Sequence, residues 1–352
     1  MCKRIGIIIR SLKPGGAEKQ SALLASVLAA NYKVFLFIQY NEISPSNKLL
    51  ISHSNIQLIN LSGNIFSKTQ RLRIIILEEH ISHIFAYLSS DNLIASLANF
   101  RIKSCVVYGG VRSSLLPKHK LLVIKLLHHF FQKGTIFNNH KGQNTFHKLG
   151  FNKKKSIVIP NGISLKKHDS RYAHNGTIKI ISVGRFVDAK DYFTAIKAIK
   201  ELKKISSIAF KLYIIGFGPL ESEIKELIEI LELQQTIVIK IKPDNINDYY
   251  QSADIYLCTS SFEGLSNSIM EAINYRLPIV ATKVGDNDRL VINQHNGILT
   301  EVGQYKAIAN ALKELMNNKE LREQYGNNGY YHLKENYSIQ EFTNRYIKLI
   351  EN

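Results

Sequence analysis

Two glutamates, Glu263 and Glu271, lie in the stretch of the sequence whose residue types are best suited to chemistry. Seven residues separate them, and the pattern around them predicts a buried strand at 255–259, a helix at about 265–275 and a second buried strand at 278–282. The start of a helix carries unpaired backbone N–H groups and the positive end of the helix dipole, so it suits a phosphate. We expect a phosphorylated ligand to lie across this helix start, within reach of Glu271. The pattern alone fits an ordinary strand–helix–strand unit with two surface acids equally well.

Small residues and two cations complete the expected anion site. Ser266, Asn267 and Ser268 stand at the predicted helix start, where their size lets a phosphate approach the backbone closely. Arg185 and Lys190 follow a different predicted strand, and an arginine fork with a lysine point charge suits a diphosphate there. The alternative for these two cations is an ordinary place on the protein surface.

Glycine turns follow several predicted strands, at the positions where parallel α/β sheets usually bind ligands. Gly15 and Gly16 separate the first predicted strand from a helical pattern, which is how a nucleotide-type α/β domain begins. This turn does not match GxGxxG, so the dinucleotide fingerprint is absent. Comparable turns in the second half contain Gly184 and the pair Gly216 and Gly218.

The length and composition of the chain bound its class. A chain of 352 residues with 45% hydrophobic residues suits two globular domains. Its three cysteines are widely spaced without a CxxC pair, which fits a reducing compartment and predicts neither a disulfide framework nor a zinc site. The first residues read as a strand rather than a secretory leader, and no apolar run is long enough to span a membrane.

Positive charge is concentrated in the first half of the chain. Residues 1–165 contain 22 Lys and Arg against 5 Asp and Glu, a net of +17, whereas residues 166–352 contain 24 against 23, a net of +1. Such an asymmetry is typical of proteins that bind a polyanion or an anionic membrane surface. A solvated basic surface without a partner is the alternative.

Two segments of this basic half mix cations with long apolar runs. Residues 66–80 begin with Lys68, Arg71 and Arg73 and continue into four consecutive aliphatic residues, and residues 117–134 interleave lysines and histidines with leucines and phenylalanines. As amphipathic helices they are suited to an anionic bilayer surface. The alternative is that they are helices packed on the sheet of their own domain.

Several motifs, in order along the chain, carry a resemblance to a known family. They are GGAE at 15–18, IPNG at 159–162, the GRF turn with its lysine at 184–190, GFGPL at 216–220, and the two glutamates followed by LPIVAT and Gly285. In this combination the chain resembles the retaining nucleotide-sugar glycosyltransferases of family 4, which have the B-type fold. The resemblance spans nearly the whole chain and is more specific than any one motif.

The resemblance implies a role for each candidate residue. It makes Arg185 and Lys190 the pair that neutralises the departing nucleoside diphosphate. Glu263 would face the transferred sugar or steady the transition state, and Glu271 would accept hydrogen bonds from the ribose hydroxyls. The remaining substrate contacts would come from Gly15, Gly16, Arg112, Gly184, Gly216, Gly218, Lys242, Ser266, Asn267 and Ser268.

One loop departs from the family pattern. Many members have a histidine near residues 109–114 that touches the transferred sugar, whereas this chain has Arg112 and Ser113 there and no histidine. A histidine-based role is therefore in doubt. The resemblance implies no metal and no other cofactor, and Asp286 and Asp288, which imitate a DxD metal motif, match the family's glycine turn instead.

The fold that the resemblance implies is α/β, with two Rossmann-like domains facing across a cleft. Residues 1–165 would form an N-terminal acceptor-binding domain and residues 166–335 a C-terminal nucleotide-sugar-binding domain. Residues 336–352 would form a C-terminal helix that crosses back and packs on the first domain. The polar residues at 164–177 would be the linker.

The expected activity is metal-independent transfer of a hexose or N-acetylhexosamine from a UDP-sugar to a hydroxyl of a lipid-linked or surface-glycan acceptor. In the implied front-face displacement a phosphate oxygen takes the proton, so the site needs positive charge and oriented N–H groups rather than a strong base. Acceptors in similar enzymes are often carried on a polyprenyl diphosphate or a lipopolysaccharide core. Together with the basic half, this predicts a cytoplasmic protein bound to the inner face of the cell membrane, with no nucleic-acid partner.

Two rival functions remain open at this stage. A nucleotide-sugar epimerase of similar fold would leave the basic half unexplained. A membrane-bound scaffold with a dead site is disfavoured by the intact acids and cations. The sugar, the acceptor, the linkage and the oligomeric state cannot be read from the sequence.

Overall fold

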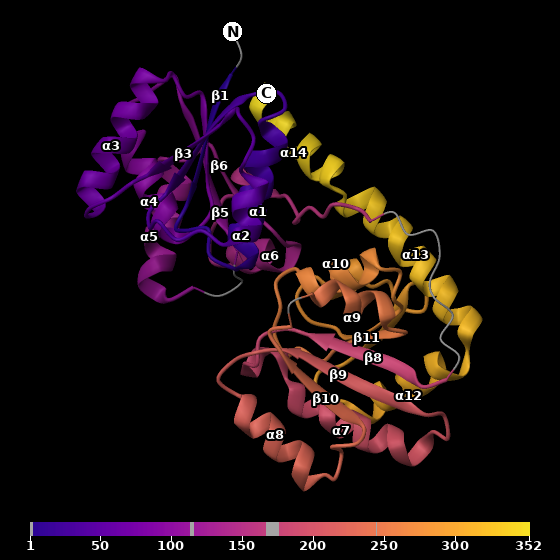
Figure 1. Cartoon of the computed structure of the whole chain (residues 1–352). Coiled ribbons are helices and arrows are strands. Elements are labelled where there is room, and N and C mark those ends of the chain that lie inside the picture. Colours follow the sequence, from indigo (N-terminus) through magenta and orange to yellow (C-terminus); the bar gives the residue numbers. More distant parts are fainter. Residues whose placement is uncertain (1–2, 113–115, 167–175, 244) are drawn as a thin grey trace. The chain divides into compact units, whose positions relative to one another are not determined.

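The computed structural model describes residues 3–112, 116–166, 176–243 and 245–352, and these form two compact units. The first unit comprises Met1–Gly162 with Ile339–Asn352, and the second comprises Ile163–Ser338. Each unit is built on one parallel sheet with helices packed on it (Figure 1). The expected class, an α/β fold with two Rossmann-like units, is confirmed.

The first unit has a seven-stranded sheet in the order β3-β2-β1-β4-β5-β6-β7. Its strands are β1 (Arg4–Ile9), β2 (Lys33–Ile38), β3 (Ile56–Asn60), β4 (His83–Ala86), β5 (Val106–Val111), β6 (Gly134–Phe137) and β7 (Ser156–Val158). Its helices are α1 (Gly16–Leu28), α2 (Pro45–Leu50), α3 (Ile65–Glu78), α4 (Ser89–Ala98), α5 (Lys118–Phe130), α6 (His140–Lys148) and α14 (Ile339–Glu351), with a 3₁₀ turn at Lys153–Lys155.

The second unit has a six-stranded sheet in the order β10-β9-β8-β11-β12-β13. Its strands are β8 (Ile178–Val183), β9 (Phe210–Gly216), β10 (Ile237–Ile241), β11 (Ile255–Cys258), β12 (Ile279–Thr282) and β13 (Gly297–Thr300). Its helices are α7 (Tyr192–Ile205), α8 (Glu221–Ile230), α9 (Ile246–Ser252), α10 (Asn267–Asn274), α11 (Asn287–Leu290), α12 (Tyr305–Asn317) and α13 (Lys319–Tyr337), with a 3₁₀ turn at Asp188–Lys190.

Both sheets reverse their strand order beside the first strand of the unit. The first strand lies between the second strand and the fourth, so the connections on its two sides run to opposite faces of the sheet. In open α/β sheets, ligands bind outside the carboxyl ends of the strands at such a switch point. The topology therefore directs attention to the loops that follow β1 and β4, and to those that follow β8 and β11.

The last helix, α14, belongs to the core of the first unit. Phe342, Tyr346 and Ile350 are buried on one face of it, each four residues after the last, as an amphipathic helix requires. The ring of Tyr346 meets that of Phe85 edge to face, with the ring centroids 5.1 Å apart. This helix completes the apolar cover of the first sheet.

Strand β5 is longer than the sequence predicts. We expected a strand at 105–108 followed by a loop from Gly109, but Gly109, Gly110 and Val111 continue the strand and pair with β6. A Cβ on Gly110 would lie 2.3 Å from the carbonyl oxygen of Ala86, so a glycine is needed where β5 passes β4. The serines of the expected loop, at 113–114, and most of the expected linker, at 167–175, lie outside the described residues.

Helix α3 packs on its sheet, as the alternative interpretation held. Its Leu72 and Ile76 are buried, and so is Lys68, while Arg73 donates hydrogen bonds to the carbonyl oxygens of Ala98 and Phe100. Only Arg71 of the three expected surface cations is exposed. Lys68 and Arg73 are therefore not available to a bilayer surface as the amphipathic interpretation requires.

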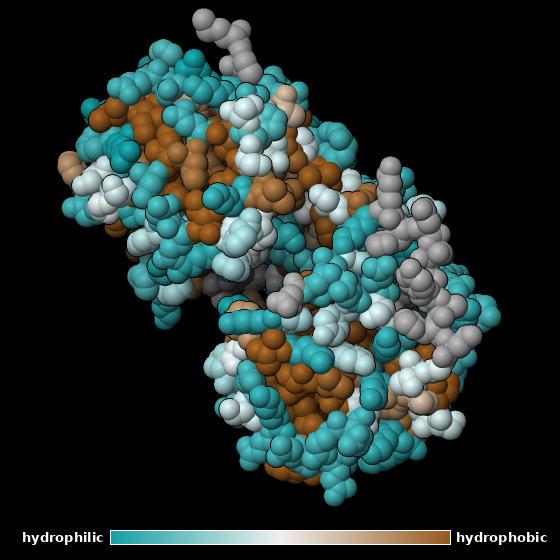
Figure 2. Space-filling model, in the orientation of Figure 1, coloured by the Kyte–Doolittle hydropathy of each residue, from teal (hydrophilic) through white to brown (hydrophobic). Residues whose placement is uncertain are grey.

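Apolar side chains do remain exposed on the first unit. Figure 2 shows brown side chains among teal ones over the part of this unit that carries α3. The exposed apolar residues of α3 and α5 are Ile65, Phe66, Ile74, Leu77, Leu122, Val123, Leu126 and Phe130. No helix within the described ranges combines the length and the apolarity needed to cross a bilayer.

Close backbone contacts fix the loops at the carboxyl edge of the second sheet. A Cβ on Gly216 would lie 1.8 Å from the carbonyl oxygen of Gly184, and one on Gly218 would lie 2.4 Å from that of Phe186. Gly285 has φ of +55°, and a Cβ there would lie 2.4 Å from the carbonyl oxygens of Glu263 and Gly264. Only glycine allows these loops to touch.

We predict that Gly285→Ala destabilises the protein more than Gly303→Ala. Both glycines have a positive φ, but a Cβ on Gly303 would meet nothing within 4 Å. Gly303→Ala should therefore cost only the backbone strain, about 1–2 kcal/mol, whereas Gly285→Ala must also push two loops apart. Urea unfolding followed by circular dichroism measures both free energies of unfolding, and equal losses would contradict the prediction.

Candidate active site

The candidate site lies where the topology directs, at the carboxyl ends of β8 and β11 in the second unit. The loop after β8 carries Arg185 and Lys190, and the loop after β11 carries Glu263 and leads into α10. These two strands are hydrogen-bonded neighbours in the sheet. Residues about 75 positions apart in sequence thus meet at one edge.

The central contact of the site is an ion pair between Lys190 Nζ and Glu263 Oε1. The same carboxylate oxygen accepts a hydrogen bond of 2.9 Å from Ser260 Oγ. Both charged side chains are largely buried, with 21% of the lysine and 12% of the glutamate side chain exposed. Charges this far from water stay in place only when they are paired, so each fixes the position of the other.

Backbone geometry directs Lys190 towards this partner. The next residue, Asp191, adopts a left-handed conformation with φ of +45°, which an aspartate tolerates better than most residues. Asp191 caps the start of α7: its carboxylate accepts hydrogen bonds from the backbone N–H and the hydroxyl of Thr194. Thr259 Oγ1 in turn lies 2.9 Å from the carbonyl oxygen of Asp191 and donates to it. The lysine is thus held between a helix cap and β11.

Gly285 and the residue after it close the other side of the Glu263 loop. The N–H of Asp286 donates a hydrogen bond of 2.9 Å to the carbonyl oxygen of Gly264. A separate bond of 3.0 Å joins the N–H of Ser261 to the carbonyl oxygen of Ala189. The loop with the glutamate is therefore fixed from both neighbouring loops.

Helix α10 begins at the residues expected to receive a phosphate. Its N-cap, Ser266, is only 2% exposed, and its hydroxyl lies 3.2 Å from that of Ser268. The predicted helix at 265–275 is present, although its first helical residue is Asn267. The positive end of the helix dipole therefore points out of the same edge of the sheet that carries the ion pair.

Glu271 lies one turn further along α10, and a stack of tyrosines supports it. Tyr250 donates a hydrogen bond of 3.2 Å to Glu271 Oε2, and its ring is parallel to that of Tyr275 at a centroid distance of 5.4 Å. Burial raises the pKa of Tyr250 well above its ordinary value, so the phenol remains a donor at neutral pH. Glu271 is thereby held in one orientation.

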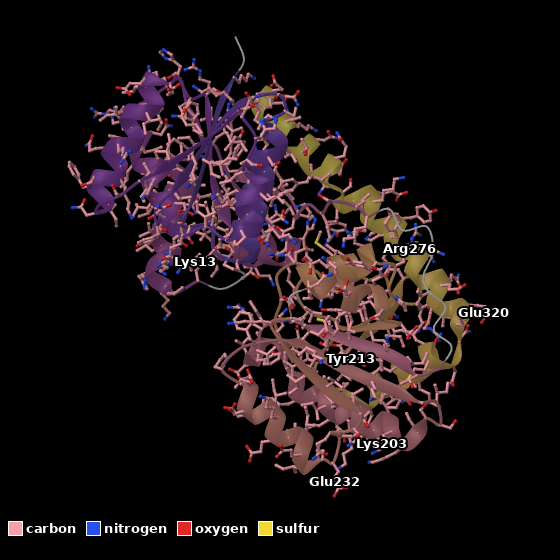
Figure 3. The ribbon with its side chains drawn as sticks, viewed as in Figure 1. Lys13, Lys203, Tyr213, Glu232, Arg276 and Glu320 are labelled. Carbon is pink, nitrogen blue, oxygen red and sulfur yellow. The ribbon has the colours of Figure 1, made fainter. Side chains whose placement is uncertain are left out.

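The far end of α10 is anchored on α13. Arg276 follows this helix with a positive φ, and Figure 3 shows it beside α13. Its guanidinium lies 4.1 Å from the ring centroid of Tyr330 and donates to Asn327 Oδ1. A Cβ on Gly326 would lie 2.1 Å from the carbonyl oxygen of Arg276, so α13 approaches this turn as closely as a glycine permits.

Two further cations are exposed on this edge of the sheet. Arg185 is exposed, and its position follows from the bond between the N–H of Phe186 and the carbonyl oxygen of Phe217. Lys242, after β10, is also exposed and lies over the ring of Phe217, 4.4 Å from its centroid. The sequence reasoning did not single out Phe217, whose only signal was an apolar residue between two glycines of a turn.

The remaining expected site residues belong to the first unit. Gly15 and Gly16 stand at the start of α1, where Gly15 is the N-cap. Arg112 follows β5, and its guanidinium lies 4.3 Å from the ring centroid of Tyr87 and donates to Tyr346 Oη. The structure thus brings together the second-unit candidates at one sheet edge, and it holds Arg112 against two tyrosines.

Three supporting residues carried no usable signal in the sequence. Ser260, Thr259 and Tyr250 each hold a candidate residue or its loop, but serine, threonine and tyrosine are common at strand ends and in short helices. The partners of Thr259 and Tyr250 lie 68 and 21 positions away along the chain. Ser260 contacts Glu263 three residues on, through a loop conformation that only the fold reveals. Within the described ranges, no group of three or more His, Cys, Asp and Glu side chains is placed to hold a metal ion.

Comparison with known proteins agrees with this geometry. Residues 166–332, which hold every second-unit candidate, match the family model described as glycosyl transferases group 1. An N-acetylgalactosamine-N,N'-diacetylbacillosaminyl-diphospho-undecaprenol 4-alpha-N-acetylgalactosaminyltransferase of Campylobacter jejuni is 26% identical over 345 residues, covering 92% of this chain and 93% of the relative. An uncharacterized glycosyltransferase of Haemophilus influenzae is also 26% identical, covering 91% and 92%.

Solved structures establish the fold. The crystal structure of Anabaena HepE in complex with UDP superposes with a TM-score of 0.86 at 18% identity, covering 99% of each chain. The apo lipopolysaccharide outer core galactosyltransferase WaaB gives a TM-score of 0.78 at 15% identity, with 99% of each chain covered. The fold is therefore that of the B-type glycosyltransferases. Residues 166–332 match the glycosyl transferases group 1 model, and the matches along the chain support glycosyltransferase activity.

Proposed function

We propose that the chain transfers a hexose or an N-acetylhexosamine from a UDP-sugar, with retention of configuration, to a hydroxyl of a lipid-linked or surface-glycan acceptor. The observation that carries this proposal is the edge of the second sheet, where Lys190 pairs with Glu263, Arg185 is exposed in the same loop as Lys190, and α10 begins just after Glu263. HepE was solved with UDP and with UDP-glucose, and the name of the C. jejuni relative specifies a diphospho-undecaprenol acceptor.

The donor diphosphate would lie between the two cations and the start of α10. Lys190 and Arg185 would neutralise the charge that develops on the leaving phosphate, and N–H groups at the helix start would add oriented dipoles. Because Lys190 and the start of α10 are held in place before the donor binds, they would need little reorganisation when the bond breaks. No protein base is required if a phosphate oxygen of the donor takes the proton of the acceptor hydroxyl.

The two glutamates would contact different parts of the donor. Glu263 uses Oε1 to hold Lys190 and Ser260, and no described residue bonds to its Oε2, which would face the sugar. Glu271, fixed by Tyr250, would accept hydrogen bonds from the ribose. Gly184, Gly216, Gly218 and Lys242 would line the rest of the nucleotide, and the first unit, with Gly15, Gly16 and Arg112, would bind the acceptor.

An activity assay tests the proposed function against its rivals. The full chain is incubated with labelled UDP-glucose, UDP-galactose, UDP-N-acetylglucosamine or UDP-N-acetylgalactosamine and a bacterial lipid extract. Label in the lipid fraction with an α-anomeric proton in the NMR spectrum supports the proposal. Conversion of one UDP-sugar into another identifies an epimerase, and neither product identifies a scaffold.

We predict that Arg185→Ala and Lys190→Ala each lower turnover by roughly 10² or more, because each removes a charge-assisted contact to the leaving phosphate. Lys197→Ala is the matched control, since Lys197 is an exposed lysine on α7 outside the site. Steady-state kinetics with a fixed acceptor measure the effect. Turnover within about threefold of wild type for both site variants would rule out the diphosphate assignment.

The two glutamates should respond differently to loss of charge. Glu271→Gln should weaken UDP binding by about 1.5–3 kcal/mol, the size of a hydrogen bond to a charged group. Glu263→Gln should leave UDP binding nearly unchanged and lower turnover instead. Calorimetric titration with UDP and initial rates separate the two effects, and the opposite pattern would mean that the roles are exchanged.

We also propose that the protein is cytoplasmic and binds peripherally to the inner face of the cell membrane through its first unit. The support is the net charge of +17 over residues 1–165 and the exposed apolar side chains of α3 and α5. A cation near an anionic leaflet contributes about 1 kcal/mol. Lys68 and Arg73 are engaged within the unit, so the exposed Arg71 and Lys118 are the cations to test.

Binding to liposomes should require anionic lipid and fall steeply with salt, because surface charges are screened over about 10 Å at 0.1 M salt. Reversing Arg71 and Lys118 to glutamate together should weaken it at least tenfold, by the contribution that each cation makes. The same reversal at Lys197, in the second unit, should not. Sedimentation with liposomes measures the binding, and a wild type that ignores anionic liposomes at low salt would refute the membrane proposal.

A further inference from the structure

The first unit contains a cavity of about 980 Å³ at the carboxyl edge of its sheet. It is lined from the ends of β1, β2 and β4 and from the first turns of α3, α4 and α5. Three helices therefore direct their N-termini at one hollow, and each N-terminus carries partial positive charge. The cavity lies beside the switch point of this sheet, where a ligand is expected.

The side chains that line this cavity carry positive charge without a carboxylate among them. Arg10, Lys68 and Lys120 are permanent cations on its wall, and His119 is a fourth basic residue. Arg10 and Lys68 lie over the ring of Tyr40, at 5.4 and 4.6 Å from its centroid. Within the described part of the chain, none of these three cations forms an ion pair.

Lys68 is the most informative of the lining residues, because it is only 6% exposed. Its ammonium donates a hydrogen bond of 3.3 Å to Gln39 Oε1, a neutral partner. Asp91, the buried acid that bonds to the same Gln39, has both oxygens engaged, because they accept bonds from Gln39 Nε2 at 2.6 Å and from the N–H of Leu88 at 2.8 Å. A buried ammonium without a counter-ion is costly unless an anion arrives to pair with it.

Several of the other lining residues are apolar, and the rest of the wall includes the polar residues Gln39, Asn64, Ser89 and Ser90. Ile65 and Phe66 from α3 and Val123 and Ile124 from α5 line the cavity together with Leu93. Phe66 is 71% exposed, so its ring is available to a ligand rather than used in the core. A free phosphate would not need these residues, and an uncharged lipid would not need the cations. The lining as a whole suits a ligand that has an anionic head group and an apolar chain.

We propose that this cavity binds the phosphate or diphosphate of a lipid-linked molecule, with the phosphate on Lys68, Arg10 and Lys120 and the chain on Phe66 and Val123. This inference rests on the proposed function in taking the lipid to be the carrier of the acceptor sugar. These residues would hold the carrier, and the sugar on it would be the acceptor for transfer. Lys68 thus serves as a ligand-binding residue rather than a contact to the bilayer.

The test is a calorimetric titration of the full chain without nucleotide. Three probes separate the sources of binding: farnesyl diphosphate, inorganic pyrophosphate and farnesol. We expect farnesyl diphosphate to bind at least tenfold more tightly than either other probe. Lys68→Met should weaken the binding of farnesyl diphosphate at least tenfold. A double variant that combines Arg10→Gln with Lys120→Gln should do the same, because each variant loses charge-assisted hydrogen bonds.

Matched controls come from the same helices. Arg71→Gln on α3 and Lys118→Gln on α5 remove exposed cations that do not line the cavity, and they should leave binding unchanged. Circular dichroism and the melting temperature check that each variant folds. Should Lys68→Met fail to fold, the double variant decides, because Arg10 and Lys120 are exposed and their loss does not disturb the core.

Several results would overturn the proposal. Wild-type binding of farnesyl diphosphate by the double variant would show that the cations do not hold the phosphate. Equal binding of pyrophosphate would show a site for free phosphate, and equal binding of farnesol would show an apolar site only. Sugar transfer at wild-type rates in Lys68→Met or the double variant would refute the cavity and leave the proposed function standing. If farnesyl diphosphate binds as expected but no sugar is transferred, the cavity proposal stands and the proposed function fails.

Discussion

The ion pair between Lys190 and Glu263 is the interaction on which the site of the second unit depends. The two residues come from the loops after β8 and β11, and their side chains are too far buried to be left uncompensated. Every other restraint at this edge serves to bring them together: the cap of α7 at Asp191, the bond from Thr259 and the approach that Gly285 permits. The result is a lysine fixed at the edge of the sheet before any ligand binds, which is what stabilising a leaving phosphate requires.

The first unit presents the opposite electrostatic situation. Residues 1–165 contain 22 Lys and Arg against 5 Asp and Glu, so most of these cations have no acid within this segment to pair with. Lys68 is the clearest case, because it is buried, lines a cavity and, among the described residues, contacts an amide oxygen and an aromatic ring but forms no ion pair. In the second unit, an acid fixes the lysine of the site. In the first unit, the lysines and the arginine that line the cavity form no ion pair among the described residues, so they can pair with a ligand. This contrast is the physical basis for assigning the donor to the second unit and an anionic, lipid-bearing ligand to the first.

Much of the fold could be predicted from the sequence, because buried parallel strands read as short apolar runs and glycine turns mark their ends. The strand before Glu263, the helix after it and the strand of LPIVAT are all present as expected. The extent of β5 was missed because Gly109 and Gly110 look like a turn, and only the neighbouring strand shows why glycine is needed within the strand. The orientation of Lys68 was missed for a similar reason: in a helix with apolar residues on several sides, spacing does not reveal which face is buried. The role of Tyr250 could not be predicted because its partner, Glu271, lies 21 positions away, and that of Ser260 because the conformation of its loop sets the contact with Glu263.

The most direct test of the central claim is hydrogen–deuterium exchange of the full chain with and without UDP. If the edge of the second sheet binds the donor, UDP should slow exchange in residues 184–190 and 263–271, where the loops and the start of α10 meet the diphosphate. Exchange in the first turns of α3 and α5 should be unchanged, because the cavity there binds a different ligand. If UDP binds and protection appears in the first unit, while residues 184–190 and 263–271 exchange as before, the assignment of the donor site is wrong.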